Sequence, residues 1–178
     1  MNIFSKAPYR LTASGISDLM DKYTALVDWK ISHIITGEYF CPTIHKLEME
    51  AVTEVESILD NIKSGNEECM EKLMYALLLS GLAMQMIGNS RLAFGAEHHI
   101  SHLWEMTVIN EHIDALHGEK VSVGLIMYLD KYEKILQTIE SDKCKVIDNA
   151  EFETALLKDT FGRKGLYEGI LAENGESL

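Results

Sequence analysis

Five of the seven histidines of this 178-residue chain lie between His98 and His117. They belong to two segments, Gly95-Ala-Glu-His-His-Ile-Ser-His102 and Leu116-His-Gly-Glu-Lys-Val121, and to the spacer between them. Histidine is the most common protein ligand for metal ions and the side chain that titrates closest to neutral pH. A cluster of this density predicts metal binding or proton transfer.

The spacing of the first segment allows two interpretations. His98 and His102 are four residues apart, so on a helix they share one face and can reach one ion or one substrate. His99 points about 100° away from them. Histidine pairs at this spacing also pack or cap helices without binding anything, and the pair alone does not decide between these roles.

His117 adds a separate argument, because it stands at the expected N-terminus of a helix. The helix dipole disfavours a charged imidazolium there, and a neutral imidazole is the form that binds metal. A catalytic site with three ligands needs one more donor, often a carboxylate, and an open position for water or substrate. Spacing does not choose this donor among 28 acidic residues. Taken alone, Asp18 is typical of a helix-end carboxylate that the dipole favours.

The elements that would position these residues are all helical. Two prolines in the whole chain favour long helices, and alternation typical of strands is missing at useful length. Apolar residues at helical spacing predict an all-α fold, and the third helix, with a nearly continuous apolar run, should lie at the centre of the bundle. The expected helices cover residues 14–35, 43–63, 67–87, 95–110, a segment from 117 onward, 151–157 and 165–174, with a loop at 142–149.

Composition excludes several classes of partner. The net charge of −12 argues against nucleic acid, which is bound by clustered Lys and Arg. Three cysteines in no CxxC arrangement and an N-terminus without signal-peptide features predict a cytoplasmic protein. The most apolar window, residues 73–87, is shorter than the roughly 20 apolar residues that span a bilayer, so we expect no membrane insertion.

Three segments resemble the sn-glycerol-1-phosphate dehydrogenase family, within the iron-containing alcohol dehydrogenase and dehydroquinate synthase superfamily. They are Ser80-Gly-Leu-Ala-Met-Gln-Met-Ile-Gly-Asn-Ser-Arg91, Gly95-Ala-Glu-His-His-Ile-Ser-His-Leu-Trp-Glu-Met106 and Leu116-His-Gly-Glu-Lys-Val121. The opening Ala7-Pro-Tyr-Arg-Leu-Thr-Ala-Ser-Gly-Ile-Ser-Asp18 and Lys22-Tyr-Thr-Ala-Leu-Val-Asp-Trp-Lys30 resemble the first helix of that family's helical C-terminal domain. The resemblance is close over residues 7–128 and loose beyond them.

The resemblance implies a role for individual residues. A divalent metal, zinc before nickel or iron, would be held by Asp18, His98 and His117. His102 would contact the substrate beside the nicotinamide, and Asp18 would touch the substrate too. Lys22 is a weaker candidate for binding an anionic substrate group, and an exposed helix lysine without such a role is the more expected interpretation.

The reaction implied is reduction of dihydroxyacetone phosphate by NADH or NADPH, in phospholipid metabolism. The metal would polarise the ketone, and histidine and water would relay the proton to the new hydroxyl. The chain shows no glycine-rich phosphate loop, so we expect residues 1–178 to be a single helical metal-binding domain, with NAD or NADP bound mainly by a missing N-terminal α/β domain. The isolated chain should then lack dehydrogenase turnover.

Other functions stay open on the sequence. A glycerol or other polyol dehydrogenase of the same superfamily would use the same metal ligands. A stand-alone helical metal-dependent hydrolase would direct Asp18, His98 and His117 at a water molecule, and a helical interaction module would keep the histidines without chemistry. A homo-oligomer is compatible with each of these.

Overall fold

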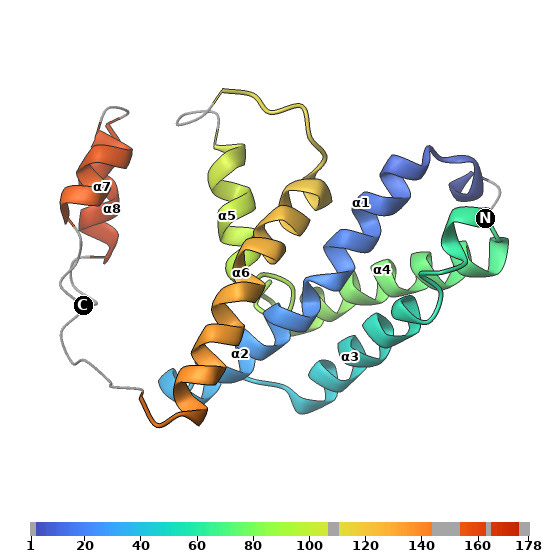
Figure 1. The fold of residues 1–178 in the computed structure, drawn as a ribbon, viewed down its shortest axis with the longest axis horizontal. Coiled ribbons are helices and arrows are strands. Elements are labelled where there is room, and N and C mark those ends of the chain that lie inside the picture. Colours follow the sequence, from blue (N-terminus) through green and yellow to red (C-terminus); the bar gives the residue numbers. More distant parts are fainter. Residues whose placement is uncertain (1–2, 107–110, 144–153, 163–164, 175–178) are drawn as a thin grey trace. The chain divides into compact units, whose positions relative to one another are not determined.

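The computed structural model describes residues 3–106, 111–143, 154–162 and 165–174. The regular elements in these ranges are helices (Figure 1). The predicted all-α fold class is confirmed. Two short 3₁₀ helices, η1 (Phe4–Lys6) and η2 (Ile62–Ser64), accompany the α-helices. None of the helices in the described part of the chain is long and apolar enough to cross a membrane.

The chain divides into two compact units. Residues 1–102 and 114–130 form the first, and residues 103–113 and 131–178 form the second. The first unit contains the histidine cluster and the helices that pack around it. The second contains α7 (Thr154–Phe161) and α8 (Tyr167–Asn174). The prediction of one helical domain over residues 1–178 stays a prediction.

The first predicted helix, residues 14–35, is wrong in its bounds, because the structure has two helices there. α1 (Tyr9–Met20) begins directly after Pro8, and α2 (Lys22–Thr36) follows after the single turn residue Asp21. The Lys22 ammonium donates to the Asp18 carbonyl oxygen at 2.9 Å, and the Thr24 hydroxyl donates to the Asp21 carbonyl at 2.8 Å. Side chains that bond helix carbonyls are a common cause of bends, and this break lies beside Asp18.

The second and third predicted helices correspond to α3 (Pro42–Glu56) and α4 (Glu67–Ile87). α3 begins at Pro42, one residue before its predicted start, and ends at Glu56 rather than at residue 63. α4 has the predicted bounds, because the Asn66 side chain accepts from the Glu68 amide at its start and Gly88, with φ of 76°, ends it.

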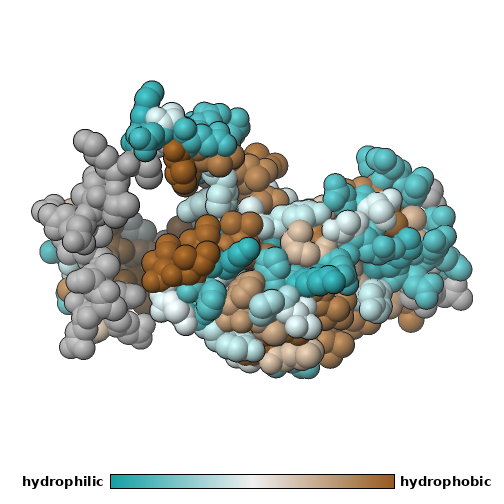
Figure 2. All heavy atoms as spheres, turned by 90° about the horizontal axis from the view of Figure 1, so that it is seen from below, coloured by the Kyte–Doolittle hydropathy of each residue, from teal (hydrophilic) through white to brown (hydrophobic). Residues whose placement is uncertain are grey.

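The central position predicted for α4 in the bundle stays a prediction. In the first unit one face of α4 packs on α1, α3 and η1 and joins an apolar cluster with α2. Apolar side chains on its other face are exposed. Several other helices also carry exposed apolar side chains, and Figure 2 shows apolar areas on one side of the molecule. Those of α4 are Tyr75, Leu78, Leu82 and Met86.

Two apolar clusters set the positions of the site-bearing helices. One joins α1, α3 and α4 and includes Leu19, the residue after Asp18. The other joins α2, α3 and α4 to the segment before α5 through Trp29, Leu92 and Ala93. Burial of these side chains is the main stabilising contribution to the unit, and it anchors the chain directly before the histidine segment.

α5 (Ala96–Glu105) and α6 (His117–Glu140) carry the histidines. α6 begins at His117, as predicted, whereas α5 ends five residues before its predicted end. Two glycines of α6 allow close packing in the first unit. A Cβ on Gly118 would lie 1.9 Å from the Ser14 carbonyl oxygen of α1, and one on Gly124 would lie 2.7 Å from the Glu97 carbonyl oxygen of α5. The start of α6 therefore depends on the absence of side chains at these positions.

The remaining predictions concern the second unit. α7 continues past the predicted end at residue 157, and the first three positions of the predicted helix 151–157 lie outside the described residues. α8 overlaps the predicted helix 165–174. The predicted loop at 142–149 lies outside the described residues except at its first two positions.

Candidate metal centre

Three helices of the first unit bring Asp18, His98 and His117 together. Asp18 lies in the last turn of α1, His98 in the first turn of α5, and His117 is the first residue of α6. The Asp18 Oδ1 atom lies 3.5 Å from His98 Nε2 and 3.6 Å from His117 Nε2. One ligand atom from each residue can be chosen so that all three lie within 4.8 Å of one another.

These separations suit a small divalent cation. Zinc lies roughly 2.0–2.1 Å from histidine nitrogen and carboxylate oxygen, so two ligand atoms of a tetrahedral site are about 3.3 Å apart. The two measured distances to Asp18 exceed this value by a few tenths of an ångström. One carboxylate and two imidazoles form a donor set that zinc, nickel and iron all accept.

His98 supplies the strongest independent sign of a ligand. Its side chain is 1% exposed, and its Nε2 atom is buried without a hydrogen-bond partner. Buried polar atoms are nearly always bonded, so an unpartnered nitrogen facing a carboxylate and a second imidazole calls for an explanation. A cation bound between these three side chains supplies one.

The cluster is closed on one side and open on the other. The side chains of Asp18 and His117 are 32% and 41% exposed, whereas the side chain of His98 is buried. A catalytic metal site keeps such an open position for water or substrate, whereas a structural site is enclosed by four protein ligands.

His102 lies beside this group, on the same face of α5 as His98. Its ring centroid is 5.7 Å from that of His98 and 5.6 Å from that of His117. Phe94 packs against both α5 rings, at 4.3 Å from His98 and 5.5 Å from His102. Position and solvent access fit a side chain that meets a substrate. His99 is exposed on the outside of the helix.

A second layer of carboxylates lies behind His98. The Nδ1 atom of this histidine is 3.3 Å from Glu97 Oε1 and 2.7 Å from Asp21 Oδ2. Only the contact with Glu97 has the geometry of a hydrogen bond, and the Asp21 contact is a close ion pair. The Glu97 carboxylate also accepts from the Gly95 amide at 2.8 Å and from the Thr24 hydroxyl at 2.9 Å.

Lys22 is buried within this layer and is 2% exposed. Its ammonium lies 3.3 Å from Asp21 Oδ1, 2.9 Å from the Asp18 carbonyl oxygen and 3.4 Å from the Ala93 carbonyl oxygen. The expectation of an exposed helix lysine is therefore wrong. In this arrangement the charge of Lys22 is directed at protein oxygens, which favours a structural role over contact with an anionic substrate.

Charge is unevenly distributed around His98. Burial alone would raise the pKa of Asp18, but His98, Lys22 and His117 together lower it. The pKa of Glu97 is likewise lowered against the effect of burial, by His98, Thr24 and backbone amides, while burial raises the pKa of Asp21. Burial opposes the charged form of His98, yet these carboxylates raise its pKa to about 10. The surroundings of this histidine thus strongly favour a positive charge.

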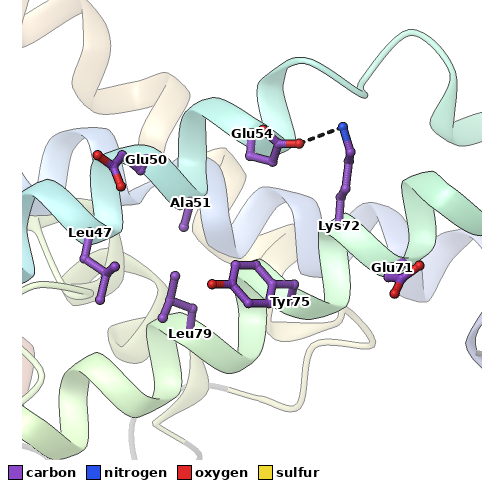
Figure 3. A pocket seen from close by; sticks show the side chains of 8 residues that line it. All are labelled: Leu47, Glu50, Ala51, Glu54, Glu71, Lys72, Tyr75 and Leu79. Carbon is purple, nitrogen blue, oxygen red and sulfur yellow. Dashed lines mark ion pairs between the residues drawn. The ribbon is translucent and has the colours of Figure 1, made fainter.

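Cavities elsewhere in the first unit do not compete for a phosphorylated substrate. One of them, of about 410 Å³, is an open groove between α3 and α4 that contains no histidine (Figure 3). Its one lysine, Lys72, lies 2.6 Å from the Glu54 carboxylate, and two further glutamates line it. Negative charge of this density repels phosphate. A second cavity of about 240 Å³ below η1 is lined by apolar side chains, Thr12 and Gly15.

Reasoning from the sequence missed the second layer. Asp21 follows Asp18 by three residues and so shares its helical face, and Glu97 directly precedes His98. Both were hidden among many acidic residues that are typical of solvated helix surfaces. The spacing Asp18-x-x-Asp21 was the available signal.

Comparison with known proteins agrees with the resemblance seen in the sequence. A glycerol-1-phosphate dehydrogenase (NAD(P)+) of Geobacillus thermodenitrificans is 35% identical over 142 residues, 79% of this chain and 35% of that enzyme. The enzyme of Geobacillus stearothermophilus is 34% identical over 85% of this chain and 38% of its own length, and that of Thermococcus sibiricus is 39% identical over 79% and 40%. No protein-family model matches the chain. The chain thus spans well under half the length of these relatives, and over most of its own length its resemblance to the glycerol-1-phosphate dehydrogenase family is confirmed.

Proposed function

We propose that this chain is the metal-binding helical part of an NAD(P)-dependent oxidoreductase like glycerol-1-phosphate dehydrogenase, which reduces dihydroxyacetone phosphate. The observation that carries the proposal is the convergence of Asp18, His98 and His117 around the unpartnered Nε2 atom of His98. The relatives are glycerol-1-phosphate dehydrogenases, which supports the reaction class.

In this proposal Asp18, His98 and His117 hold a divalent cation, with zinc the first candidate. The chemistry that such a cation supplies is Lewis-acid polarisation of a carbonyl oxygen. Asp18 keeps its charge because its pKa is lowered, so it contributes an anionic ligand on the open side of the cluster. Phe94 packs against the His98 ring, and the His98 side chain is almost fully buried, so water has little access to it.

His102 is the proposed proton carrier and substrate contact. It lies on the open side of the cluster, within reach of a molecule bound over His117. Histidine is the side chain that most often serves as a general acid or base in enzymes. We propose that the nicotinamide cofactor is bound mainly by a part of the enzyme that residues 1–178 do not include, and that the enzyme works in the cytoplasm.

Metal uptake is the first test. The 178-residue chain, dialysed against zinc and then against buffer, should retain about one zinc per chain by elemental analysis. The variants Asp18→Ala and His117→Ala should lose it, while His99→Ala, an exposed histidine of the same helix, should keep it. Retention of zinc by both ligand variants would contradict the proposed site.

A chimera tests the reaction. Residues of the Geobacillus thermodenitrificans enzyme that align with this chain are replaced by the corresponding residues of the chain. We expect oxidation of NADH or NADPH with dihydroxyacetone phosphate, and no oxidation in the same chimera with His102→Ala. A zinc-loaded chain that instead hydrolyses phosphate esters, with loss in Asp18→Ala, would point to the hydrolase alternative.

A further inference from the structure

The two nitrogen atoms of His98 face different surroundings. Nε2 faces Asp18 and His117 on the open side, whereas Nδ1 faces Asp21 and Glu97 in the interior. Asp21, Glu97 and His98 could also hold an ion by distance alone, since their ligand atoms lie within 4.8 Å of one another. A metal ion could therefore bind His98 on either of two sides of its ring.

The interior side is already occupied by protein contacts. Glu97 accepts from the Gly95 amide and the Thr24 hydroxyl, and Asp21 lies against the Lys22 ammonium. A lysine ammonium next to the carboxylate opposes a second cation there. The 2.7 Å between Nδ1 and Asp21 Oδ2 is the separation of a close ion pair. It is shorter than two ligand atoms around one ion would allow.

We propose that Asp21 and Glu97 are positioning residues that keep the proton on Nδ1 of His98 and thereby leave Nε2 as the metal ligand. This inference rests on the proposed metal centre and assigns its inner support. Histidine ligands commonly donate their second nitrogen to a carboxylate, which fixes the tautomer and the ring orientation. Lys22 holds Asp21 in this arrangement, and Thr24 together with the Gly95 amide holds Glu97.

The geometry of the break between α1 and α2 supports this assignment. Asp18 belongs to the end of α1 and Asp21 is the turn residue that follows, so one short segment supplies both a candidate ligand and a positioning carboxylate. The Lys22 ammonium bonds both the Asp18 carbonyl and the Asp21 carboxylate. Each side of the His98 ring therefore meets an aspartate from the same turn.

The test compares zinc affinity and the state of the His98 ring in the 178-residue chain. Asp21→Asn and Glu97→Gln each remove one charge and keep the size of the side chain. We expect each to raise the zinc dissociation constant by about 10- to 100-fold. Glu48→Gln is the control, because it removes a buried carboxylate of α3 that is influenced electrostatically by Ser80, Lys22 and Asp21 and has no contact with His98 among its causes of pKa change. Its zinc affinity should stay within about twofold of the original.

Nitrogen-15 NMR of the histidine rings reports which ring nitrogen carries the proton and which binds the metal. Unfolding of a variant does not produce the same signal. In the zinc-loaded chain, with His98 assigned by its loss in His98→Gln, the proton should be on Nδ1 and the metal on Nε2. A metal on Nδ1, or Asp21→Asn and Glu97→Gln variants that bind zinc as tightly as the original chain, would overturn the inference. A chain that binds no zinc at all would instead contradict the proposed function. Circular dichroism identifies a variant that does not fold, and the ring assignment of the unchanged chain then decides the question.

Discussion

Gly118 and Ser14 are in such close contact that a Cβ on the glycine would lie 1.9 Å from the serine carbonyl oxygen. This contact joins the start of α6 to α1 one residue after His117 and four residues before Asp18. Two of the three candidate ligands are therefore held near each other by this contact and, one residue further along α6, by the ion pair between Arg10 and Glu119.

Gly118→Ala should separate α6 from α1. Because the atom that a methyl group would meet is backbone, the helices must shift, and we expect a loss of about 1–3 kcal/mol in the free energy of unfolding and weaker zinc binding. Gly81→Ala is the matched control. Gly81 is in a helix with nothing within 4 Å of an added Cβ, so alanine should leave stability unchanged or raise it slightly. Urea unfolding and zinc titration measure both; equal behaviour of the two variants would contradict the packing argument.

Lys22→Met should destabilise the first unit strongly. The substitution leaves the Asp21 carboxylate buried without its ammonium partner, and the loss of one partner of a buried pair typically costs about 3–5 kcal/mol. Lys46→Met removes a lysine whose ion pair with Glu50 is exposed, and its unfolding midpoint should not move. A Lys22→Met chain as stable as the original would show that the buried pair is not needed.

Glu48 should make stability depend on pH. Both of its carboxylate oxygens are buried without a hydrogen-bond partner, and burial raises its pKa although Ser80 and Lys22 oppose this. Above its ordinary pKa of about 4.5 the unfolded chain releases this proton before the folded chain does, so the contribution of Glu48 to stability falls as pH rises through that window. Glu48→Gln should therefore be more stable than the original at pH 8, with a gap that narrows toward pH 4.5. Urea unfolding across this range checks it, with the exposed Glu50→Gln as control; a gap independent of pH would contradict the assignment.

Substitutions of His98 and His102 should have different effects on zinc binding and activity, although the two residues share one helical face. His98→Ala should abolish zinc retention, because it removes the buried ligand. His102→Ala should keep zinc at about one per chain and lose only substrate-dependent activity in the chimera. Loss of zinc in both variants would mean that the two histidines act as a chelating pair.

The helices of the first unit could largely be predicted from sequence, and their ends depended on local signals. Asn66 and Gly88 mark the ends of α4 by capping, and a proline marks the start of α3. The break at Asp21 could not be predicted from periodicity, because apolar residues continue at helical spacing across it. Side-chain bonds from Lys22 and Thr24 to helix carbonyls accompany the break, and such bonds depend on burial.

The candidate site was also predictable only in part, because some of its residues form a local sequence pattern and others are brought together only by the fold. The histidine cluster is visible as a pattern, whereas Asp18 is distant in sequence and was identified by the resemblance alone. Asp21 and Glu97 look like ordinary surface acids until the fold places them behind His98. The exposed apolar face of α4 was equally hidden, because an apolar run does not show which of its sides meets another helix.

The three candidate ligands also have a consequence for how the chain unfolds. Asp18 and His98 are separated by roughly 80 positions, and His117 follows about 20 positions later. A cation held by all three would close both loops at once, so it would act as a removable crosslink between α1, α5 and α6 that restricts the unfolded chain. Removal of the cation by a chelator should then separate α1, α5 and α6 before the apolar clusters of α1–α4 unfold.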